Sequence, residues 1–326
     1  MAGPLHIALL GATGTIGRAV AAALVADGHT VVCLLRPAPD LAPDARPVPP
    51  DCAARYVHFA DAGDVLTNGF AAPRFDAVVS CLASRTGTPR DAWAVDHQAH
   101  LHVLAAAEAT GVGHLVLLSA ICLQKPRLAF QHAKLAFEQR LRASSLRWSI
   151  VRPTAYFKSL SGQIERVRKG RPFLLFGDGR GTACKPISDR DLARYLADCL
   201  HQPERWNQVL PIGGPGPAIT PREQGERLFD VFGQRPRFRH VPVRLLDGII
   251  AVLSLLGRLW PTLADKAELA RIGRYYATES MLVLNPATGQ YDAAATPETG
   301  HDTLFAFYAQ QAAGDARPAR GDHAVF

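Results

Sequence analysis

The sequence is poor in the features that mark several large classes of protein. Its six cysteines are scattered without a CxxC pair, which argues against a structural zinc site and favours reduced thiols in an intracellular protein. The N-terminus enters an apolar run at Leu5 and lacks the basic start and cleavage site of a secretory signal. Residues 248–257 are uncharged and apolar, but a helix needs roughly 20 such residues to cross a bilayer. We therefore expect a cytoplasmic protein.

Excess positive charge is scarce outside one segment. Of the net charge of +7, residues 152–194 contribute +6, with ten Lys and Arg against four Asp and Glu. This segment mostly lacks the aromatic residues that lie between the charges of nucleic-acid-binding surfaces, so we expect no nucleic-acid partner. An anionic small molecule, a membrane surface and a plain solvated face remain as interpretations of the segment.

Apolar runs alternate with helical stretches through the first half of the chain. The runs cover residues 5–10, 30–35, 56–59, 77–81, 114–118 and 148–151, and helical patterns cover residues 18–26, 97–110 and 132–143. This alternation predicts an α/β fold, a doubly wound parallel sheet of the Rossmann type with helices on both faces.

The second half predicts a smaller lobe. We expect a dinucleotide-binding domain at residues 1–152 and a mixed C-terminal substrate lobe at 153–313, with some strands rejoining the main sheet. Residues 314–326 read as a disordered tail. Thr220, Pro221 and Glu223 predict a helix start with a capping box. Residues 248–257 favour a buried helix over a segment that lines the substrate pocket or lies on a membrane.

A glycine-rich loop follows the first apolar run and opens a helix. Its Gly-x-x-Gly-x-x-Gly spacing suits a dinucleotide: the glycines allow a tight turn, close approach of the pyrophosphate, and close packing of helix on strand. The helix N-terminus offers N–H groups and a positive dipole to the phosphates. The alternative is a glycine turn without a ligand. We expect the cofactor to contact Gly11, Thr13, Gly14, Thr15, Ile16 and Gly17.

The end of the second apolar run distinguishes the two nicotinamide cofactors. An acid there would bind the ribose 2′-hydroxyl, but the run ends at Arg36 and the next acid is Asp40. The Arg36 guanidinium suits a 2′-phosphate, which predicts NADPH. Asp61, after the third run, is placed to reach the adenine amino group. The alternative for both side chains is a place on the solvated surface.

Three segments resemble the extended and atypical short-chain dehydrogenase/reductase superfamily. They are the glycine-rich loop, Val151-Arg152-Pro153, and the stretch from Ser119 to Lys134. That superfamily usually carries Tyr-x-x-x-Lys, whereas this sequence keeps Lys134 and has Phe130 at the tyrosine position. Ketoreductase and sugar-epimerase activities would therefore lose their proton donor.

Longer strings are similar to the NADPH-dependent divinyl chlorophyllide 8-vinyl reductases, which make monovinyl chlorophyllides in chlorophyll and bacteriochlorophyll synthesis. The resemblance covers about residues 5–310, and four of its strings lie outside the generic nucleotide fold. The strings are residues 118–134 (LSAICLQKPRLAFQHAK), 149–162, 176–191 (FGDGRGTACKPISDRD), 210–225 and 264–283.

The resemblance implies an oxidoreductase that reduces the 8-vinyl group of divinyl (proto)chlorophyllide a to ethyl, with a hydride from NADPH and a proton. No carbonyl oxygen needs protonating, so a phenylalanine at position 130 is intelligible. Phe130 would pack against the ring system or the nicotinamide. Lys134 would hydrogen-bond the nicotinamide ribose, and Thr154 would help to seat the carboxamide.

An apolar macrocycle with carboxylates needs an apolar pocket and a few cations. Lys158, Arg180 and Lys185 are the candidates, with a solvated face as the alternative. The proton donor stays open among Tyr156, Lys158 and solvent, because His132 is expected to face elsewhere on its helix. We single out no metal ligand.

The resemblance also implies contact with the periphery of the photosynthetic membrane, where such pigments reside. Two other functions stay open. One is a non-catalytic NADP(H)-binding sensor or assembly subunit, for which the retained glycines and the missing tyrosine suffice. The other is a different tetrapyrrole or quinone reductase. The sequence predicts no oligomeric state.

Overall fold

A seven-stranded parallel sheet forms the centre of the computed structural model, which describes residues 3–37 and 48–314. The strand order is β3-β2-β1-β4-β5-β6-β8, which reverses direction at β1 and β4 as in a Rossmann fold. The prediction of a doubly wound α/β sheet is confirmed. The strands are β1 (His6–Leu10), β2 (Thr30–Leu35), β3 (Ala53–Tyr56), β4 (Ala77–Ser80), β5 (His114–Leu118), β6 (Arg147–Pro153) and β8 (Gln208–Ile212).

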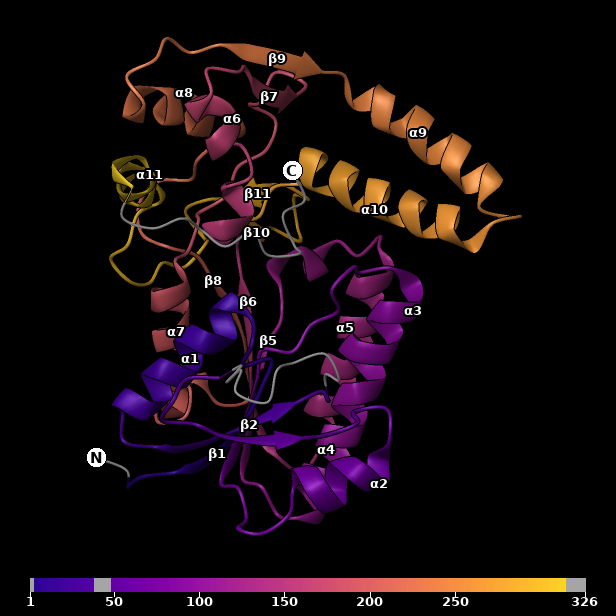
Figure 1. Cartoon of the computed structure of the whole chain (residues 1–326), viewed down its shortest axis with the longest axis vertical. Coiled ribbons are helices and arrows are strands. Elements are labelled where there is room, and N and C mark those ends of the chain that lie inside the picture. Colours follow the sequence, from indigo (N-terminus) through magenta and orange to yellow (C-terminus); the bar gives the residue numbers. More distant parts are fainter. Residues whose placement is uncertain (1–2, 38–47, 315–326) are drawn as a thin grey trace.

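Helices cover both faces of this sheet (Figure 1). In β1, Ile7 and Leu9 belong to the core beneath α1 and α7, whereas Ala8 and Leu10 belong to the core beneath α4 and α5. Burial on both sides explains why the central strands are continuously apolar. One face carries α1 (Thr15–Ala26) and α7 (Asp189–Asp198); the other carries α2 (Ala62–Asp64), α3 (Pro89–Ala92), α4 (His100–Ala109) and α5 (Ala129–Arg142), with π-helical turns at Val65–Gly69 and Trp93–Ala99.

A smaller lobe follows β6 and returns one strand, β8, to the edge of the main sheet. Its own core surrounds Phe229 and Tyr308. The predicted capping box is confirmed, because the Thr220 hydroxyl accepts a hydrogen bond from the Glu223 N–H. The lobe contains the parallel pair β7 (Phe173–Phe176) and β9 (Phe238–Val241), the antiparallel pair β10 (Val283–Leu284) and β11 (Tyr291–Asp292), and helices α6 (Ile164–Arg168), α8 (Pro221–Val231) and α11 (Leu304–Ala313).

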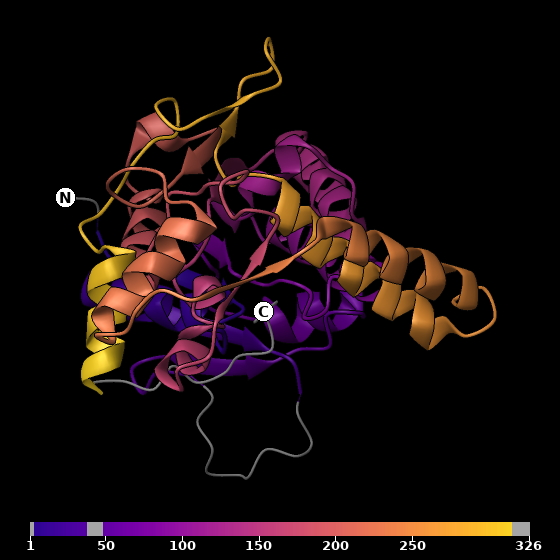
Figure 2. The same cartoon turned by 90° about the horizontal axis from the view of Figure 1, so that it is seen from above.

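Two further helices, α9 (Val243–Leu256) and α10 (Pro261–Thr278), form a hairpin that projects from the body of the molecule (Figure 2). The prediction of a buried helix at residues 248–257 is wrong, because no residue of α9 is buried and Leu255 is 62% exposed. The physical reason is that α9 packs mainly on α10, so within the described residues its outer side has no apolar layer above it.

The third strand also departs from expectation. It covers Ala53–Tyr56 rather than 56–59, because β3 is an edge strand whose largely exposed residues, Ala-Ala-Arg-Tyr, form no run of large apolar side chains. Val57 and Phe59, which suggested the strand, lie in the following loop and enter the core. Asp40 and nearly all of the expected tail, residues 315–326, lie outside the described residues. Among those described, no helix has the length and apolar character needed to cross a bilayer.

Candidate functional site

The glycine-rich loop lies at the carboxyl end of β1, where the strand order reverses. A Cβ on Gly11, whose φ is +76°, would lie 2.5 Å from the carbonyl carbon of Cys81, and one on Gly17 would lie 2.1 Å from the Gly11 carbonyl oxygen. A Cβ on Gly14 would meet its nearest neighbour at 3.4 Å. The first and third glycines are thus demanded by the protein's own packing, whereas the second leaves room for a ligand.

The N-terminus of α1 is suited to an anion. Gly14 is its N-cap, no side chain among the described residues caps it, and its first turn contains Arg18 but no acid. Thr13, Thr15 and Arg18 line a cavity of about 700 Å³ together with Lys158, whose ammonium lies 2.6 Å from the Thr15 hydroxyl. Free N–H groups, the helix dipole and two cations all favour a phosphate.

Ile16 behaves differently from its neighbours in the loop. Its side chain packs against the core between α1 and α7, so only its backbone belongs to the helix N-terminus. The structure therefore brings the predicted loop residues together, with threonine side chains outside and the isoleucine side chain inside.

Asp189 lines the same cavity and was missed by sequence reasoning. Its Oδ1 is buried and has no hydrogen-bond partner among the described residues. Burial raises the pKa of its carboxyl group, while the nearby Lys158 ammonium opposes that rise. A buried oxygen without a donor is unfavourable, so this side of the cavity suits a ligand that offers a hydroxyl or an N–H group.

Arg36 and Asp61 occupy the sheet edge in different ways. Arg36 is exposed directly after β2, and Leu34 of that strand is aligned with Leu10, so Arg36 lies at the same edge as the glycine-rich loop. Asp61 caps α2, because its Oδ1 accepts hydrogen bonds from Gly63 N–H at 2.8 Å and Asp64 N–H at 3.2 Å. Part of the hydrogen-bonding capacity of Asp61 is therefore used locally.

Lys134 on α5 is held by a buried carboxylate. Its ammonium lies 2.9 Å from Oδ1 of Asp96, and the Lys134 side chain is 12% exposed. Asp96 also accepts hydrogen bonds from the Ser84 N–H at 3.1 Å and the Ser84 hydroxyl at 2.6 Å. These three contacts fix the position of the ammonium. Sequence reasoning found Lys134 but missed Asp96, which lies in another element at no recognisable spacing.

Ser119, after β5, has an engaged hydroxyl. It donates to Oε1 of the buried Glu138 at 2.6 Å, and the Arg152 guanidinium makes a bidentate contact with the same carboxylate, with Nε at 3.1 Å. With Phe130 lacking a hydroxyl, neither position offers a free O–H for carbonyl chemistry. Two of the three segments that carry the superfamily resemblance, those that contain Ser119 and Arg152, are thus joined through Glu138.

Phe130 lies in the first turn of α5 within an apolar cluster. Its neighbours include Cys122 and, on α10, Ile272. A Cβ on Gly87 would lie 3.5 Å from the Phe130 ring and 3.0 Å from Ile272, so the loop before α3 approaches both side chains closely. The hairpin therefore contributes directly to the apolar cluster around Phe130, which we call the Phe130 wall.

Two phenols and two thiols adjoin this wall. Burial and the neighbouring thiols of Cys81 and Cys122 raise the pKa of Tyr156. Burial and a hydrogen bond to Cys122 raise the pKa of Tyr276 on α10. Both phenols therefore stay protonated at neutral pH and hold that proton more tightly than an exposed tyrosine does. Tyr156 was among the donor candidates predicted from the sequence, whereas Tyr276 was not.

Thr154 and Lys185 have internal partners. The Thr154 hydroxyl donates to the Lys185 carbonyl oxygen. The Lys185 ammonium is buried, pairs with Glu298, and lies 3.3 Å from the carbonyl oxygen of Thr296. Arg180, by contrast, is exposed in the loop after β7. Of the three predicted substrate cations, Lys158 thus adjoins the glycine-rich loop, Lys185 is internal, and Arg180 faces solvent.

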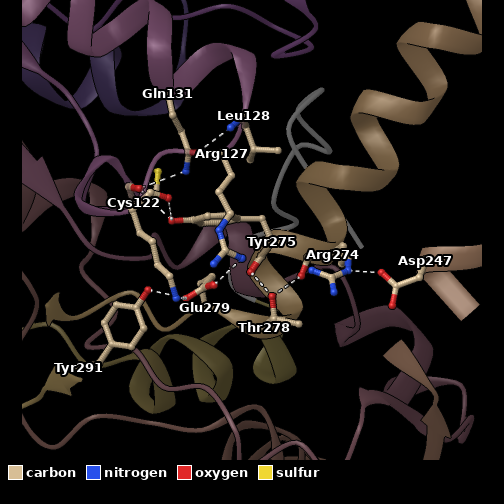
Figure 3. A network of polar contacts seen from close by, with 11 residues as sticks. Cys122, Arg127, Leu128, Gln131, Asp247, Arg274, Tyr275, Thr278, Glu279 and Tyr291 are labelled. Carbon is tan, nitrogen blue, oxygen red and sulfur yellow. Dashed lines mark hydrogen bonds and ion pairs between the residues drawn. The ribbon is translucent and has the colours of Figure 1, made fainter. Parts of the chain in front are cut away.

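A polar network fastens the base of α10 to the segment before α5 (Figure 3). The Tyr275 hydroxyl donates to the carbonyl oxygens of Cys122 at 2.9 Å and Lys125 at 3.1 Å. Glu279, beyond α10, pairs with Lys125 at 2.8 Å and Arg127 at 3.1 Å. These bonds set the end of the hairpin in a fixed place beside the Phe130 wall.

Comparison with known proteins agrees with this geometry. Residues 11–203 match a family described as NAD(P)H-binding. The quinone oxidoreductase QOR2 of Escherichia coli, described as NADPH-dependent, superposes with a TM-score of 0.63 at 18% identity, over 94% of this chain and 98% of that chain. At such identity the match shows the fold alone. Within residues 3–37 and 48–314, no group of three or more His, Cys, Asp and Glu side chains could hold a metal ion.

Two curated relatives extend over nearly the whole chain. The chloroplastic divinyl chlorophyllide a 8-vinyl-reductases of Oryza sativa subsp. indica and Zea mays are 49% and 48% identical to it. Each match covers 93% of this chain, with 77% and 78% of the respective relative. The chain has a glycine-rich nucleotide loop, and it keeps Lys134 while phenylalanine replaces the usual tyrosine. Its similarity to these reductases continues through the C-terminal lobe. This chain therefore belongs to the divinyl chlorophyllide a 8-vinyl-reductase family.

Proposed function

We propose that this protein reduces the 8-vinyl group of divinyl (proto)chlorophyllide a to an ethyl group, with NADPH as the reductant. NADPH supplies a hydride to one vinyl carbon, and a proton completes the ethyl group. The observation that carries this proposal is the 49% identity to a vinyl reductase over 93% of the chain. Because that similarity includes the C-terminal lobe, it favours a reductase over a non-catalytic sensor or assembly subunit.

The chain's own residues fit the cofactor. Gly11 and Gly17 cannot carry a side chain without clashing, and the uncapped α1 N-terminus faces the cavity that Lys158 borders. We assign this loop to the pyrophosphate, with Lys158 as an additional cation there. Arg36, exposed at the same sheet edge, would hold the 2′-phosphate, and its fork geometry suits that group. Asp61 keeps one carboxylate oxygen for the adenine.

Lys134 is assigned to the nicotinamide ribose, with Asp96 as the residue that positions it. The buried carboxylate sets the direction of the ammonium. Phe130 gives this wall an apolar surface for a flat conjugated ring. Thr154 would act on the carboxamide through the backbone that its hydroxyl braces, because that hydroxyl already donates to Lys185.

The proton can come from a phenol beside this wall. Tyr156 and Tyr276 are both protonated at neutral pH, and each approaches the Cys122 thiol. We assign the donor to this pair of phenols, with solvent as the source that reprotonates them.

Residues 153–313 would supply most of the substrate pocket. Arg180 is the exposed cation available for a substrate carboxylate. Lys185 would act indirectly, by holding Glu298 and the loop around it. Because the substrate is a largely apolar pigment, we also propose contact with a membrane surface.

The test is reduction of divinyl chlorophyllide a by the purified chain with NADPH or NADH, followed by pigment chromatography and the Soret band. We expect a monovinyl product with NADPH. Arg36→Ala should raise the KM for NADPH about 10–100-fold, the effect of one lost charged contact, and leave the KM for NADH unchanged. Binding of NADPH without any pigment turnover would instead support the sensor.

A further inference from the structure

Exposed large hydrophobic side chains are concentrated on the α9–α10 hairpin. Among the described residues, eight of the eleven lie there. Five of them are spaced 4, 3, 4 and 3 residues apart, so they share one side of α9 and the turn after it. We call these five the apolar stripe: Leu245, Ile249, Val252, Leu256 and Leu259. The other three are Leu255, Trp260 and Leu269.

The stripe is distinct from the side of α9 that packs on α10. A Cβ on Gly257 would lie 2.8 Å from the Ala264 backbone nitrogen, which shows how closely the two helices approach at the turn. Ser254 receives a hydrogen bond from Arg271 of α10 at 2.6 Å. Since one side of α9 already serves the hairpin, the stripe adds a second apolar side, and such a helix is stable in water only if something covers it.

Basic residues flank the stripe at both ends. No acid occurs between Asp230 and Asp247, and Asp247 is paired with Arg274. The turn and the start of α10 carry two exposed cations and one exposed acid, Asp265. The exposed basic residues are Arg235, Arg237, Arg239 and Arg244 before and at the start of α9, and Arg258 and Lys266 at the tip.

We propose that the apolar stripe and the Leu259–Trp260 tip insert into the headgroup region of an anionic lipid bilayer. An apolar face flanked by cations is the pattern of helices that lie in a membrane interface. Tryptophan favours that depth, because its ring is apolar and its N–H remains solvated. The 14 residues of α9 extend about 21 Å, too short to span a bilayer and long enough to lie along its surface.

A second copy of this chain fits the stripe less well. A two-fold pairing of α9 would set like charge against like charge in either direction, since both ends of the stripe are basic. An anionic surface complements both ends at once. Charge therefore selects lipid over a symmetric partner.

The anchoring of α10 gives this surface a role in the proposed reaction. Its base is bonded to the segment before α5 (Figure 3), and Ile272 and Tyr276 of the same helix contribute to the Phe130 wall. A hairpin docked along the apolar stripe would hold that wall near the bilayer that dissolves an apolar pigment. This step rests on the proposed vinyl reduction, whereas docking itself does not.

Docking is tested by co-sedimentation of the full chain with pigment-free vesicles of phosphatidylcholine, with or without phosphatidylglycerol. We expect binding to the mixed vesicles that weakens with salt, and at least tenfold weaker binding to phosphatidylcholine alone. Leu245→Glu, a change within the apolar stripe, should weaken binding to the mixed vesicles at least tenfold. The matched control is Leu66→Glu, an exposed leucine in the sheet domain, which should bind as the unaltered chain does.

The depth of Trp260 in the bilayer is measured by the quenching of tryptophan fluorescence by brominated lipid. The Trp260→Phe variant gives the signal of the other tryptophans. We expect quenching that Trp260→Phe removes. Absence of vesicle binding, or unchanged binding by Leu245→Glu, overturns the proposal. So does a dimer seen by light scattering that Leu245→Glu dissociates while vesicles bind neither form. Since the vesicles contain no pigment, failure here is separate from failure of the vinyl reduction.

Discussion

Buried carboxylates hold the cations of this site in position through ion pairs. Asp96 holds Lys134, and Glu138 holds both Ser119 and Arg152. In each case the acid is almost inaccessible to water, so removal of its charge leaves a cation without compensation. The position of Lys134 is therefore a property of the pair rather than of the lysine alone.

Asp96→Asn tests this dependence. The amide keeps the shape and one acceptor for Ser84 but loses the charge that orients the ammonium, so kcat/KM should fall about 10–100-fold. Lys134→Met should add little to Asp96→Asn, because the two act as one unit. Steady-state kinetics of the single and double variants provide the check. Fully additive losses would show that Asp96 acts elsewhere. Asp230→Asn, an exposed carboxylate on α8, is the control and should leave kinetics unchanged.

The limits of sequence reasoning are also visible at single residues. Lys134, Arg36 and the glycines could be named because each belongs to a local pattern. The partner of Lys185 lies 113 residues away at Glu298, and nothing in the sequence near either residue announces the pairing. Asp61 looked free for a ligand because its capping bonds to Gly63 and Asp64 depend on where α2 begins. Long-range pairing and exact element ends are set by the whole fold.

At the scale of elements, the loop from β1 into α1 separates two uses of glycine. Gly17→Ala would place a Cβ 2.1 Å from the Gly11 carbonyl oxygen, and backbone atoms cannot move aside cheaply. We expect a loss of about 1–3 kcal/mol, or several degrees in Tm, although alanine is the better helix former. Gly14→Ala should keep the Tm of the apo protein and weaken NADPH binding at least tenfold.

Thermal unfolding followed by circular dichroism, with a fluorescence titration of NADPH, separates these outcomes. Equal NADPH affinity in Gly14→Ala and the unaltered chain would place the pyrophosphate away from the second glycine. An unchanged Tm in Gly17→Ala would mean that α1 shifts freely against β1.

Elements differ in how far their sequence reveals them. The parallel sheet was predictable because its strands are buried on both faces, and α8 because its capping box is local. The edge strand β3 was displaced in the prediction because its exposed residues give no apolar run. The helix α9 was expected to be buried, since hydrophobicity reports a need for an apolar environment without saying which molecule supplies it.

At the scale of the whole molecule, buried histidines make stability depend on pH. Burial and the Lys134 ammonium lower the pKa of His100 to about 4, and burial and Arg147 lower the pKa of His114 to about 4. His29, which meets His201 at 3.1 Å, is lowered in the same direction by burial. All three are neutral in the folded state, so the unfolded state binds more protons below its ordinary value of about 6.5.

The stability that these neutral histidines contribute is therefore fully present above pH 6.5 and is lost as the pH falls toward 4. His100 and His114 together should cost on the order of 4 kcal/mol at pH 5 relative to pH 7.5. Urea unfolding at the two pH values measures the loss, and His100→Gln should reduce it. The acids with lowered pKa values, such as Asp27 and Glu298, lose their contribution as the pH falls below their ordinary values of 3.8 and 4.5, which lie below pH 5. Equal stability at pH 7.5 and 5 would contradict the assignment.

The contact between α1 and α7 determines when the nucleotide-binding half can finish folding during synthesis. The apolar side of α1 is covered by α7, and the neighbouring pair His29 and His201 is separated by 172 residues. At roughly 5–20 residues per second, a nascent chain exposes that side of its first helix for about 10–30 s before its cover emerges. The last strand of the sheet, β8, follows only at residues 208–212. The nucleotide half thus finishes folding when two thirds of the chain has left the ribosome. Until then the apolar side of α1 has to be protected from aggregation.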